Sequence, residues 1–432
     1  MSQSTVIKST LLSWCIIALG AIFYMYEYYL RISPGVMIPD LMHYFSVGAT
    51  SIGTLAGFYF YAYTPMQLVV GPLLDRFRPY QLLTLAVIAC ALGSILTGIA
   101  PADHIVIAYA GRFLQGFGSA FAFVGILKLG ATILPHNRLA LVAGLVTCLG
   151  FVGAMAGENT LAALVRHFSW QDVLITIGIF GFFLAPIFFF FVRNPHKTKQ
   201  KQPRASSKEI FNGLLLTIRQ PYLWLIGLIG GALFMPNSVF ASLWGIPFLT
   251  QTHHLSTAHA TFATSLIFLG WAIGSPLQGW LSDRLRTARL RLICVNTLIA
   301  ATIIYLVIAI PNLNYIVLCV LLLAFGVFAS AEVAVFPLAI EHMPIQYSGT
   351  AIAFVNFLTM LGGLTMQRGI GEILDLEWDG KLSHGIRIYS STAYSHALYT
   401  LPLFLICAAA LTLFAHFIKT RRNQPSKIAG AV

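Results

Sequence analysis

Residues 71–76 read Gly-Pro-Leu-Leu-Asp-Arg, and residues 279–284 read Gly-Trp-Leu-Ser-Asp-Arg. The two strings are 208 positions apart, and each follows two apolar stretches and precedes a basic turn. The same offset relates Ile-Pro-Asp-Leu at 38–41 to Ile-Pro-Phe-Leu at 246–249. The chain therefore contains an internal repeat, and a doubled membrane protein usually places its working site between its two halves.

The composition predicts a membrane protein. The 432 residues are 58% hydrophobic and 9% charged, whereas a soluble domain carries about 25% charged residues. Continuously apolar stretches of about 20 residues favour helices over a barrel, since lipid requires each segment to satisfy its own backbone. We predict an all-α membrane protein with twelve transmembrane helices at 11–38, 48–72, 81–100, 105–133, 139–165, 171–192, 222–249, 258–281, 291–310, 315–340, 348–374 and 392–418.

The net charge of +12 follows the turns between these helices. Of the 26 Lys and Arg residues, 19 lie at the chain ends and in the even-numbered turns, while the opposite turns hold Arg166, Lys381 and Arg387. By the positive-inside rule, both termini are expected in the cytoplasm. The basic excess therefore indicates orientation and attraction to membrane lipid rather than binding to nucleic acid.

One long polar segment divides the chain. We predict an N-terminal six-helix bundle at 1–192, a cytoplasmic linker at 193–220, a C-terminal six-helix bundle at 221–418 and a cytoplasmic tail at 419–432. Within the linker, Ser206 and Glu209 have capping-box spacing before an apolar face, which predicts a short amphipathic helix along the membrane surface.

Two motifs make the chain resemble the major facilitator superfamily. The Gly-Pro-Leu-Leu-Asp-Arg-Phe-Arg run at 71–78 is similar to the signature loop between the second and third helices of that family, and 279–286 is its degenerate copy. The run from Arg112 through Gln115 to Gly116 resembles the Arg-x-x-Gln-Gly pattern of the fourth helix. The resemblance implies two pseudo-symmetric six-helix bundles and a central cavity that opens to each side in turn.

The repeated loops have a physical interpretation of their own. Asp75 and Asp283 lie at the inner membrane boundary beside Arg76 and Arg284, and Gly71 begins the first copy. A carboxylate there accepts hydrogen bonds from the N-terminal amides of a neighbouring helix or pairs with a guanidinium. We predict a gating role for these five residues.

Charges inside the spans that have no counterpart in the other half are the better candidates for a site, because a buried charge is costly. The repeat offsets pair these charges with apolar residues, and the charges are Glu27, Arg31, Glu158, Glu332 and Arg368. Glu27 and Arg31 are four residues apart, so they share one helical face and can pair.

The stretch Tyr-Leu-Arg-Ile-Ser-Pro at 29–34 is similar to the region in which organic-anion members of the superfamily place a substrate-binding Arg, although Leu30 stands where those members usually have an acid. Arg31 suits a carboxylate or phosphate. Substrate at Arg31 would withdraw it from Glu27 and favour protonation of Glu27, so that proton and anion load together. The alternative is a permanent Glu27–Arg31 salt bridge with no other role.

The remaining site residues have mixed interpretations. Arg112 is expected in a structural or proton-relay role, at a depth similar to that of Glu27, Arg31 and Glu158, so these four groups are predicted to form one polar cluster facing the cavity. Glu158 and Glu332 are further candidates for proton coupling, and Tyr28 and Arg368 for substrate binding. Tyr24, Tyr59, Tyr61 and Tyr63 either line the cavity or serve as packing. Outer-loop histidines are expected to be solvated: His253, His254 and His259.

The sequence thus predicts a secondary active transporter for a small anionic or zwitterionic metabolite in a bacterial inner membrane, driven by protons, with sodium as the alternative coupling ion. The chain is expected to be a monomer without cofactor or metal. The alternative is a proton-driven efflux antiporter for amphiphilic or siderophore-like compounds, although the fifth helix lacks the Gly-Pro pair common in antiporters. An integral-membrane enzyme or a receptor without transport is disfavoured, because the sequence holds no catalytic constellation and the two-fold repeat favours a transporter.

Overall fold

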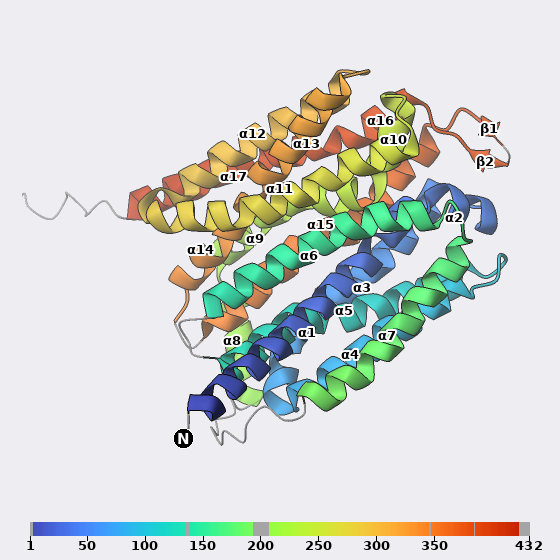
Figure 1. The fold of residues 1–432 in the computed structure, drawn as a ribbon. Helices are drawn as coiled ribbons and strands as arrows, with labels where there is room; N and C mark the ends of the chain where they lie inside the picture. The colour runs from blue at the N-terminus through green and yellow to red at the C-terminus, as the bar shows by residue number, and fades with distance from the viewer. Residues whose placement is uncertain (1–2, 135–138, 193–206, 345–346, 384, 423–432) are drawn as a thin grey trace, which may run out of the picture.

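The computed structural model describes residues 3–134, 139–192, 207–344, 347–383 and 385–422, which are largely helical (Figure 1). The first bundle contains α1 (Gln3–Val36), α2 (Ile38–Phe45), α3 (Ala49–Arg76), α4 (Pro79–Gly98), α5 (Ile105–Ile133), α6 (Leu139–Leu164) and α7 (Trp170–Val192). The predicted linker helix is α8 (Ser207–Ile218), and its predicted cap, Ser206, lies outside the described residues.

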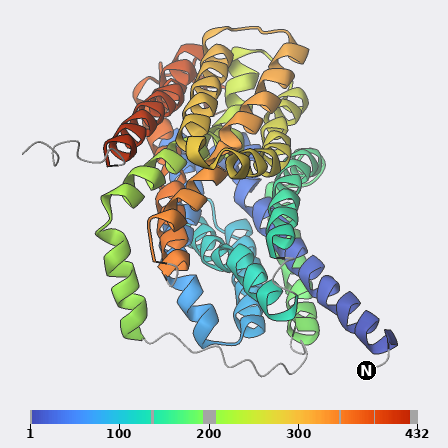
Figure 2. The ribbon, with the colours of Figure 1, turned by 90° about the vertical axis from the view of Figure 1, so that its left-hand side faces the viewer.

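The second bundle begins at residue 221 and has more interruptions. It contains α9 (Pro221–Pro236), η2 (Asn237–Trp244), α10 (Gly245–Thr252), α11 (Thr257–Arg284), η3 (Arg286–Ala288), α12 (Arg289–Ala309), α13 (Tyr315–Ala329), η4 (Ser330–Ala334), α14 (Val335–Glu341), α15 (Ser348–Leu376), β1 (Leu382–Ser383), β2 (Ile386–Arg387), α16 (Ser391–Leu398) and α17 (Thr400–Arg422). Figure 2 shows the second bundle above the first, viewed along the helices.

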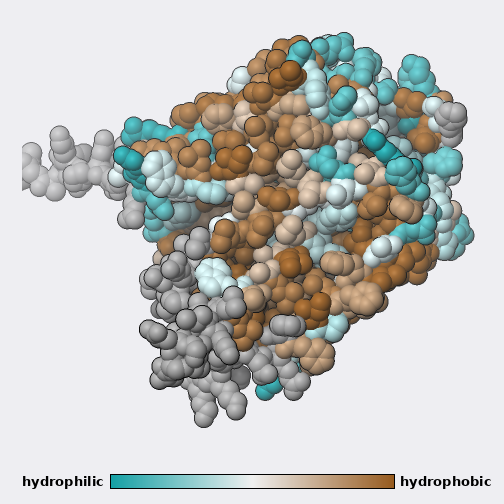
Figure 3. Space-filling model, viewed as in Figure 1, coloured by the Kyte–Doolittle hydropathy of each residue, from teal (hydrophilic) through white to brown (hydrophobic). Residues whose placement is uncertain are grey.

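The long helices coincide with the predicted apolar stretches, although one of them is not apolar enough to count as a candidate membrane span. Within the described residues, eleven segments are long and apolar enough to cross a membrane. The second predicted span is absent from these eleven, yet it forms the continuous 28-residue helix α3, whose sequence is richer in Thr, Ser and Tyr. Large apolar side chains are exposed on the sides of the molecule (Figure 3), as expected for surfaces that face lipid.

Three spans that the sequence predicts as continuous helices are interrupted. The twelfth is divided at Tyr399 between α16 and α17. The seventh changes after Pro236 into the π-helix η2, and the tenth contains the 3-10 segment η4. Proline removes a backbone donor from the helix interior, which explains the change after Pro236. Such local changes of helix type inside a span often occur at functional positions.

The molecule has two distinct ends. We call one the basic end, because the Lys- and Arg-rich turns belong to it, and the other the hairpin end, after the hairpin of β1 and β2. The basic end carries the start of α1 and the helix α8, and the hairpin end carries α2, α16 and the two-stranded hairpin of β1 and β2 (Figure 1). The hairpin pairs Leu382 with Arg387 and Ser383 with Ile386 in antiparallel register.

The bundles meet along a surface that we call the seam, where α3 packs on α15, α6 on α11 and α1 on η2. The backbones approach closely at two glycines of the α3–α15 contact. A Cβ at Gly53 would lie 2.3 Å from the carbonyl oxygen of Gln367, and one at Gly371 would lie 2.4 Å from that of Ala49. Small residues permit such close packing between membrane helices.

Candidate functional site

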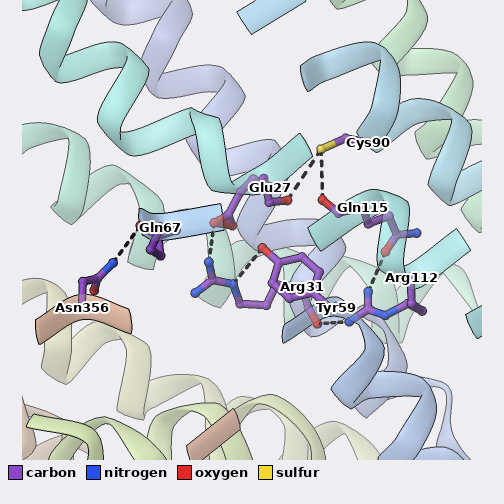
Figure 4. Close-up of polar contacts among 9 residues, drawn as sticks. Glu27, Arg31, Tyr59, Gln67, Cys90, Arg112, Gln115 and Asn356 are labelled. Atoms are coloured by element: carbon purple, nitrogen blue, oxygen red, sulfur yellow. Dashed lines mark hydrogen bonds and ion pairs between the residues drawn. The ribbon is translucent and has the colours of Figure 1, made fainter. Parts of the chain in front are cut away.

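Glu27 and Arg31 form a buried ion pair on α1. Their exposed fractions are 0% and 4%, and the Arg31 Nη2 donates to Glu27 Oε1 (Figure 4). The Arg31 Nε donates to the hydroxyl of Tyr59 at 3.2 Å. The spacing of four residues on one helix therefore produces the pair that the sequence predicts.

Four aromatic rings surround the Arg31 guanidinium, and we call them the aromatic box. The Arg31 Cζ atom lies within about 6 Å of all four ring centroids. The distances are 4.4 Å to Tyr28, 4.8 Å to Tyr63, 5.3 Å to Tyr59 and 5.9 Å to Phe60. A guanidinium stacked on aromatic faces is stabilised by their quadrupoles, and more so when desolvated. The box therefore helps to hold a cation in a site that contains one carboxylate.

Arg112 on α5 stabilises the backbone beneath this pair. It donates to the carbonyl oxygens of Leu30 at 2.7 Å and Arg31 at 3.1 Å, and to Gln115 Oε1 at 2.6 Å. Pro34 lacks the N–H that would normally reach the Leu30 carbonyl within the helix. Arg112 and the Ser33 hydroxyl satisfy that carbonyl instead. These contacts give Arg112 a positioning role.

Glu158 on α6 is buried, and within the described residues neither of its carboxylate oxygens has a hydrogen-bond partner. The neighbouring Asn159 donates to Ser265 of α11 at 2.9 Å, across the seam. In the described part of the chain, no hydrogen bond or ion pair joins Glu158 to Arg31 or Arg112. Three of the four charges of the predicted cluster are thus brought together, and the fourth is not bonded to them.

The two charges predicted in the second bundle have opposite surroundings. Glu332 lies in η4 and is 5% exposed. The Arg368 side chain is 50% exposed on α15, and its Nε donates to Glu372 at 2.7 Å. Arg368 is therefore outside the buried polar cluster around Arg31.

The second copy of the repeated loop forms a network within its own bundle. Arg289 is buried, and it donates to Asp283 at 3.1 Å, to Ser282 and to Glu341. Asp283 thus pairs with a guanidinium, which is one of the two kinds of partner that the sequence predicts for it. Arg284 lies over the ring of Trp280.

The first copy is less informative. Arg76 lies over Phe77, and a Cβ at Gly71 would meet nothing within 4 Å among the described residues. No close backbone approach therefore requires glycine at 71 in this conformation. The side chain of Asp75 is outside the described residues.

The histidine prediction is wrong at one position. His253 is buried, and its Nε2 lies 3.0 Å from the carbonyl oxygen of Val307. Burial, followed by the neighbouring His254, lowers the pKa of His253, while the contact with the Val307 carbonyl opposes this shift. It is a neutral packing residue at the hairpin end, because the loop that carries it folds back onto α12.

The aromatic box reaches the seam through residues that the sequence analysis did not select. Phe151 of α6 lies 5.3 Å from Tyr28 and 5.2 Å from Trp271 of α11, measured between ring centroids. The Trp271 Nε1 has no hydrogen-bond partner among the described residues. The pairing of apolar residues across 120 positions leaves no signal in a single sequence, although the buried indole would have been expected to find an acceptor.

Gln67 and Asn356 provide a polar contact between α3 and α15. The Asn356 side chain donates to Gln67 Oε1 at 2.9 Å (Figure 4). Phe60, a wall of the aromatic box, contacts Gly363 on the same helix pair. The cluster around Arg31 is therefore one layer of side chains away from the second bundle.

The comparison with protein families agrees with this architecture. Residues 17–366 match the model of the Major Facilitator Superfamily, so the chain belongs to this family of membrane proteins. The structure is also similar to a bacterial homologue of the human lysosomal transporter Spinster in an inward-facing, unoccupied conformation, with a TM-score of 0.78 and 15% identity over 96% of this chain and 99% of that one.

Curated relatives are more distant in sequence. The uncharacterised transporter YybO of Bacillus subtilis is 28% identical over 200 residues, which is 46% of this chain and 46% of that protein. The probable galactarate/D-glucarate transporter GudP of the same organism is 23% identical over 303 residues, 64% of this chain and 66% of that protein. The chain thus spans about half of the first relative's length and two thirds of the second's.

Proposed function

We propose that this protein is a secondary transporter that carries a small anionic or zwitterionic metabolite together with protons. The observation that carries the proposal is the buried guanidinium of Arg31, held by one carboxylate and four rings beside the seam. An isolated buried ion pair rarely adds stability over apolar packing, so stability alone does not account for this pair. A carboxylate ligand for Arg31 is also consistent with the sugar diacids in the name of GudP.

Alternating access gives this arrangement its mechanism. When the seam opens, a substrate carboxylate replaces Glu27 as the bidentate partner of Arg31. When the seam closes over the substrate, Glu27 is left without its counter-charge in a dry site, where it is stable only after taking a proton. Substrate and proton therefore load as one event, and neither crosses efficiently alone.

Glu158 and Glu332 are the further proton sites of the proposal. Each is a buried acid without an ion-pair partner among the described residues, and an ionised carboxylate is costly in such surroundings. The Glu158 site also adjoins the Asn159–Ser265 contact across the seam. Protonation at Glu158 would therefore favour the conformation in which α6 and α11 are packed together.

The orientation of the proposal follows the basic residues. The basic end faces the cytoplasm of a bacterial inner membrane, and the hairpin end faces outward. Arg78, Arg284 and Arg291 belong to turns at the basic end. The protein acts as a monomer in this proposal, because each bundle supplies half of one seam.

The test begins with ligand stabilisation. Purified protein is screened by thermal unfolding against galactarate, adipate, phosphate, amino acids and short peptides, since a ligand stabilises the fold that it binds. We expect stabilisation by a carboxylate, and we expect Arg31→Ala to abolish it. Arg368→Ala is the matched control, because it removes the same side chain from a Glu–Arg pair of the same spacing at the surface.

Transport is then measured in proteoliposomes with the best-stabilising compound. A pH gradient should drive accumulation by the unchanged protein, and Glu158→Gln should abolish accumulation while leaving substrate exchange. Outward movement driven by the same gradient would favour the exporter alternative. If Arg31→Ala binds the compound as well as the unchanged protein does, the assignment of Arg31 is wrong.

A further inference from the structure

At the hairpin end, one acidic side chain of the second bundle contacts the first turn of a helix in the first bundle. We propose that Asp375, with Tyr389 and Arg387, is a latch that holds the hairpin end of the seam closed. The proposal rests on the alternating access proposed above, because a latch has a role only if the two bundles separate at this end.

The N-terminus of α3 supplies one half of the contact. The first amides of a helix have no partner within the helix. Asp375 at the end of α15 accepts from the Thr50 N–H through Oδ2 at 2.8 Å and from the Ala49 N–H through Oδ1 at 3.2 Å. A carboxylate at this position also opposes the positive end of the helix dipole. The two bundles are thus joined by charge-assisted hydrogen bonds.

The loop after α15 supplies the rest of the latch. The Tyr389 hydroxyl donates to Asp375 Oδ1 and accepts from the Ala49 N–H at 2.9 Å. The Arg387 guanidinium lies 3.2 Å from the same carboxylate oxygen. Burial and the adjacent carboxylate raise the pKa of Tyr389, so its hydroxyl keeps the proton that it donates. The hairpin of β1 and β2 carries Arg387 into this contact.

Gly48 has no side chain that could cap α3, so the acceptor for the first amides of this helix comes from the other bundle. It occupies the N-cap position of α3, where Ser, Thr, Asp or Asn would normally provide a side-chain acceptor, and it makes no such bond. Its φ of −90° is open to any residue. A Cβ at this position would lie 2.5 Å from Asp375 Oδ1, so the absent side chain leaves room for the carboxylate.

The partners of this contact belong to different bundles, so the contact opposes opening at the hairpin end and not at the basic end. Ala49 and Thr50 belong to the first bundle and Asp375 to the second, so opening the hairpin end breaks these bonds, whereas opening the basic end alone does not require it. Losing the carboxylate therefore raises the population of molecules that are open at the hairpin end.

The experiment measures that population by water access to the seam. Gly57 is a suitable reporter position, because it is buried and a Cβ there would lie 3.7 Å from the Leu364 carbonyl oxygen of the other bundle, an ordinary contact. The full chain carrying Gly57→Cys is placed in lipid nanodiscs and treated with a membrane-impermeant maleimide. Peptide mass spectrometry then gives the modification rate at position 57, so the native cysteines can remain.

We expect Asp375→Asn to raise the modification rate about tenfold, the factor for losing one net charge-assisted hydrogen bond. Tyr389→Phe should raise it about threefold. Asp379→Asn is the control, since it makes the same chemical change four residues away in an exposed pair with Lys381, and it should leave the rate unchanged. Buried Cys90 must stay unmodified in every variant, which verifies the fold.

Two results would overturn the latch. One is an unchanged maleimide modification rate at position 57 in both Asp375→Asn and Tyr389→Phe. If amide hydrogen exchange at Ala49 and Thr50 becomes faster while that rate stays unchanged, Asp375 only caps the helix and does not hold the two bundles together. The other is an equal increase in the Asp379→Asn control. If the maleimide modifies Cys90 in the Asp375→Asn variant, that variant has lost its fold. The modification rate at position 57 in the Tyr389→Phe variant then decides whether the latch exists. Because no substrate is added, failure of the symport proposal would not alter this measurement.

Discussion

The chain contains two Glu–Arg pairs with the same spacing and very different surroundings. Glu27 and Arg31 on α1 are buried among rings, whereas Arg368 and Glu372 on α15 are each about half exposed. The four-residue spacing produces an ion pair in both helices. The difference shows that the spacing predicts the contact, while burial decides how much stability is lost when one partner is removed.

The largest effect is expected from Arg31→Ala. Removing the guanidinium leaves Glu27 as an unpaired buried acid and empties the aromatic box, which should lower the free energy of unfolding by about 3–5 kcal/mol. Denaturation in mixed micelles measures the change, and stabilisation by carboxylates should be lost in the same variant. Arg31→Lys is the control that keeps the positive charge but not the guanidinium. Normal transport by Arg31→Ala would show that the buried pair matters no more than the exposed pair on α15.

Exchanging the two charges, with Glu27→Arg and Arg31→Glu together, should have the next largest effect. The ion pair is retained, but the cation leaves the aromatic box, so we expect a loss of about 2 kcal/mol of stability. Carboxylate binding should fall about a hundredfold. If the exchanged protein transports like the unchanged one, the pair is only a salt bridge.

Glu27→Gln should produce a smaller loss of stability, about 1 kcal/mol, because the amide oxygen still accepts from Arg31. We expect carboxylate affinity to remain within a few-fold, since Arg31 is intact. Accumulation driven by a pH gradient should be lost, as measured in proteoliposomes. Accumulation that survives in this variant would move the proton site to Glu158 or Glu332.

The smallest effect is expected from Arg368→Ala. An exposed pair on a helix surface gains little from its contact, because water screens it. We expect no measurable change in melting temperature, affinity or transport. A large loss of transport would mean that Arg368 acts in another conformation of the cycle, and it would remove the basis of the comparison.

The sequence predicted the helices and the Glu27–Arg31 pair because both depend on local spacing. Apolar length defines the spans, and four residues on one helix define the pair. The aromatic box was only partly accessible: several tyrosines were noted, but the position of Phe60 depends on the packing of α3 against α1 and α15. Interrupted helices such as η2 were also missed, since their apolar pattern does not change.

The partner predicted for the Asp of each repeated loop was a helix N-terminus or a guanidinium, and Asp283 pairs with the guanidinium of Arg289 in its own bundle. The structure has an acid at a helix N-terminus of the other bundle at Asp375, which lies 326 residues from Ala49. No motif marks Asp375, because its contact depends on the close approach of two bundles rather than on neighbouring residues.

The carbonyl contacts of Arg112 have a consequence for how Arg31 works. Pro34 weakens α1 just beyond the pair, yet two backbone oxygens there are fastened to α5. The main chain under Arg31 is consequently fixed before any ligand arrives. In the proposed function, only the long side chain of Arg31 has to reorganise when substrate binds, so the entropy lost on binding is that of a few torsions rather than of a flexible helix end.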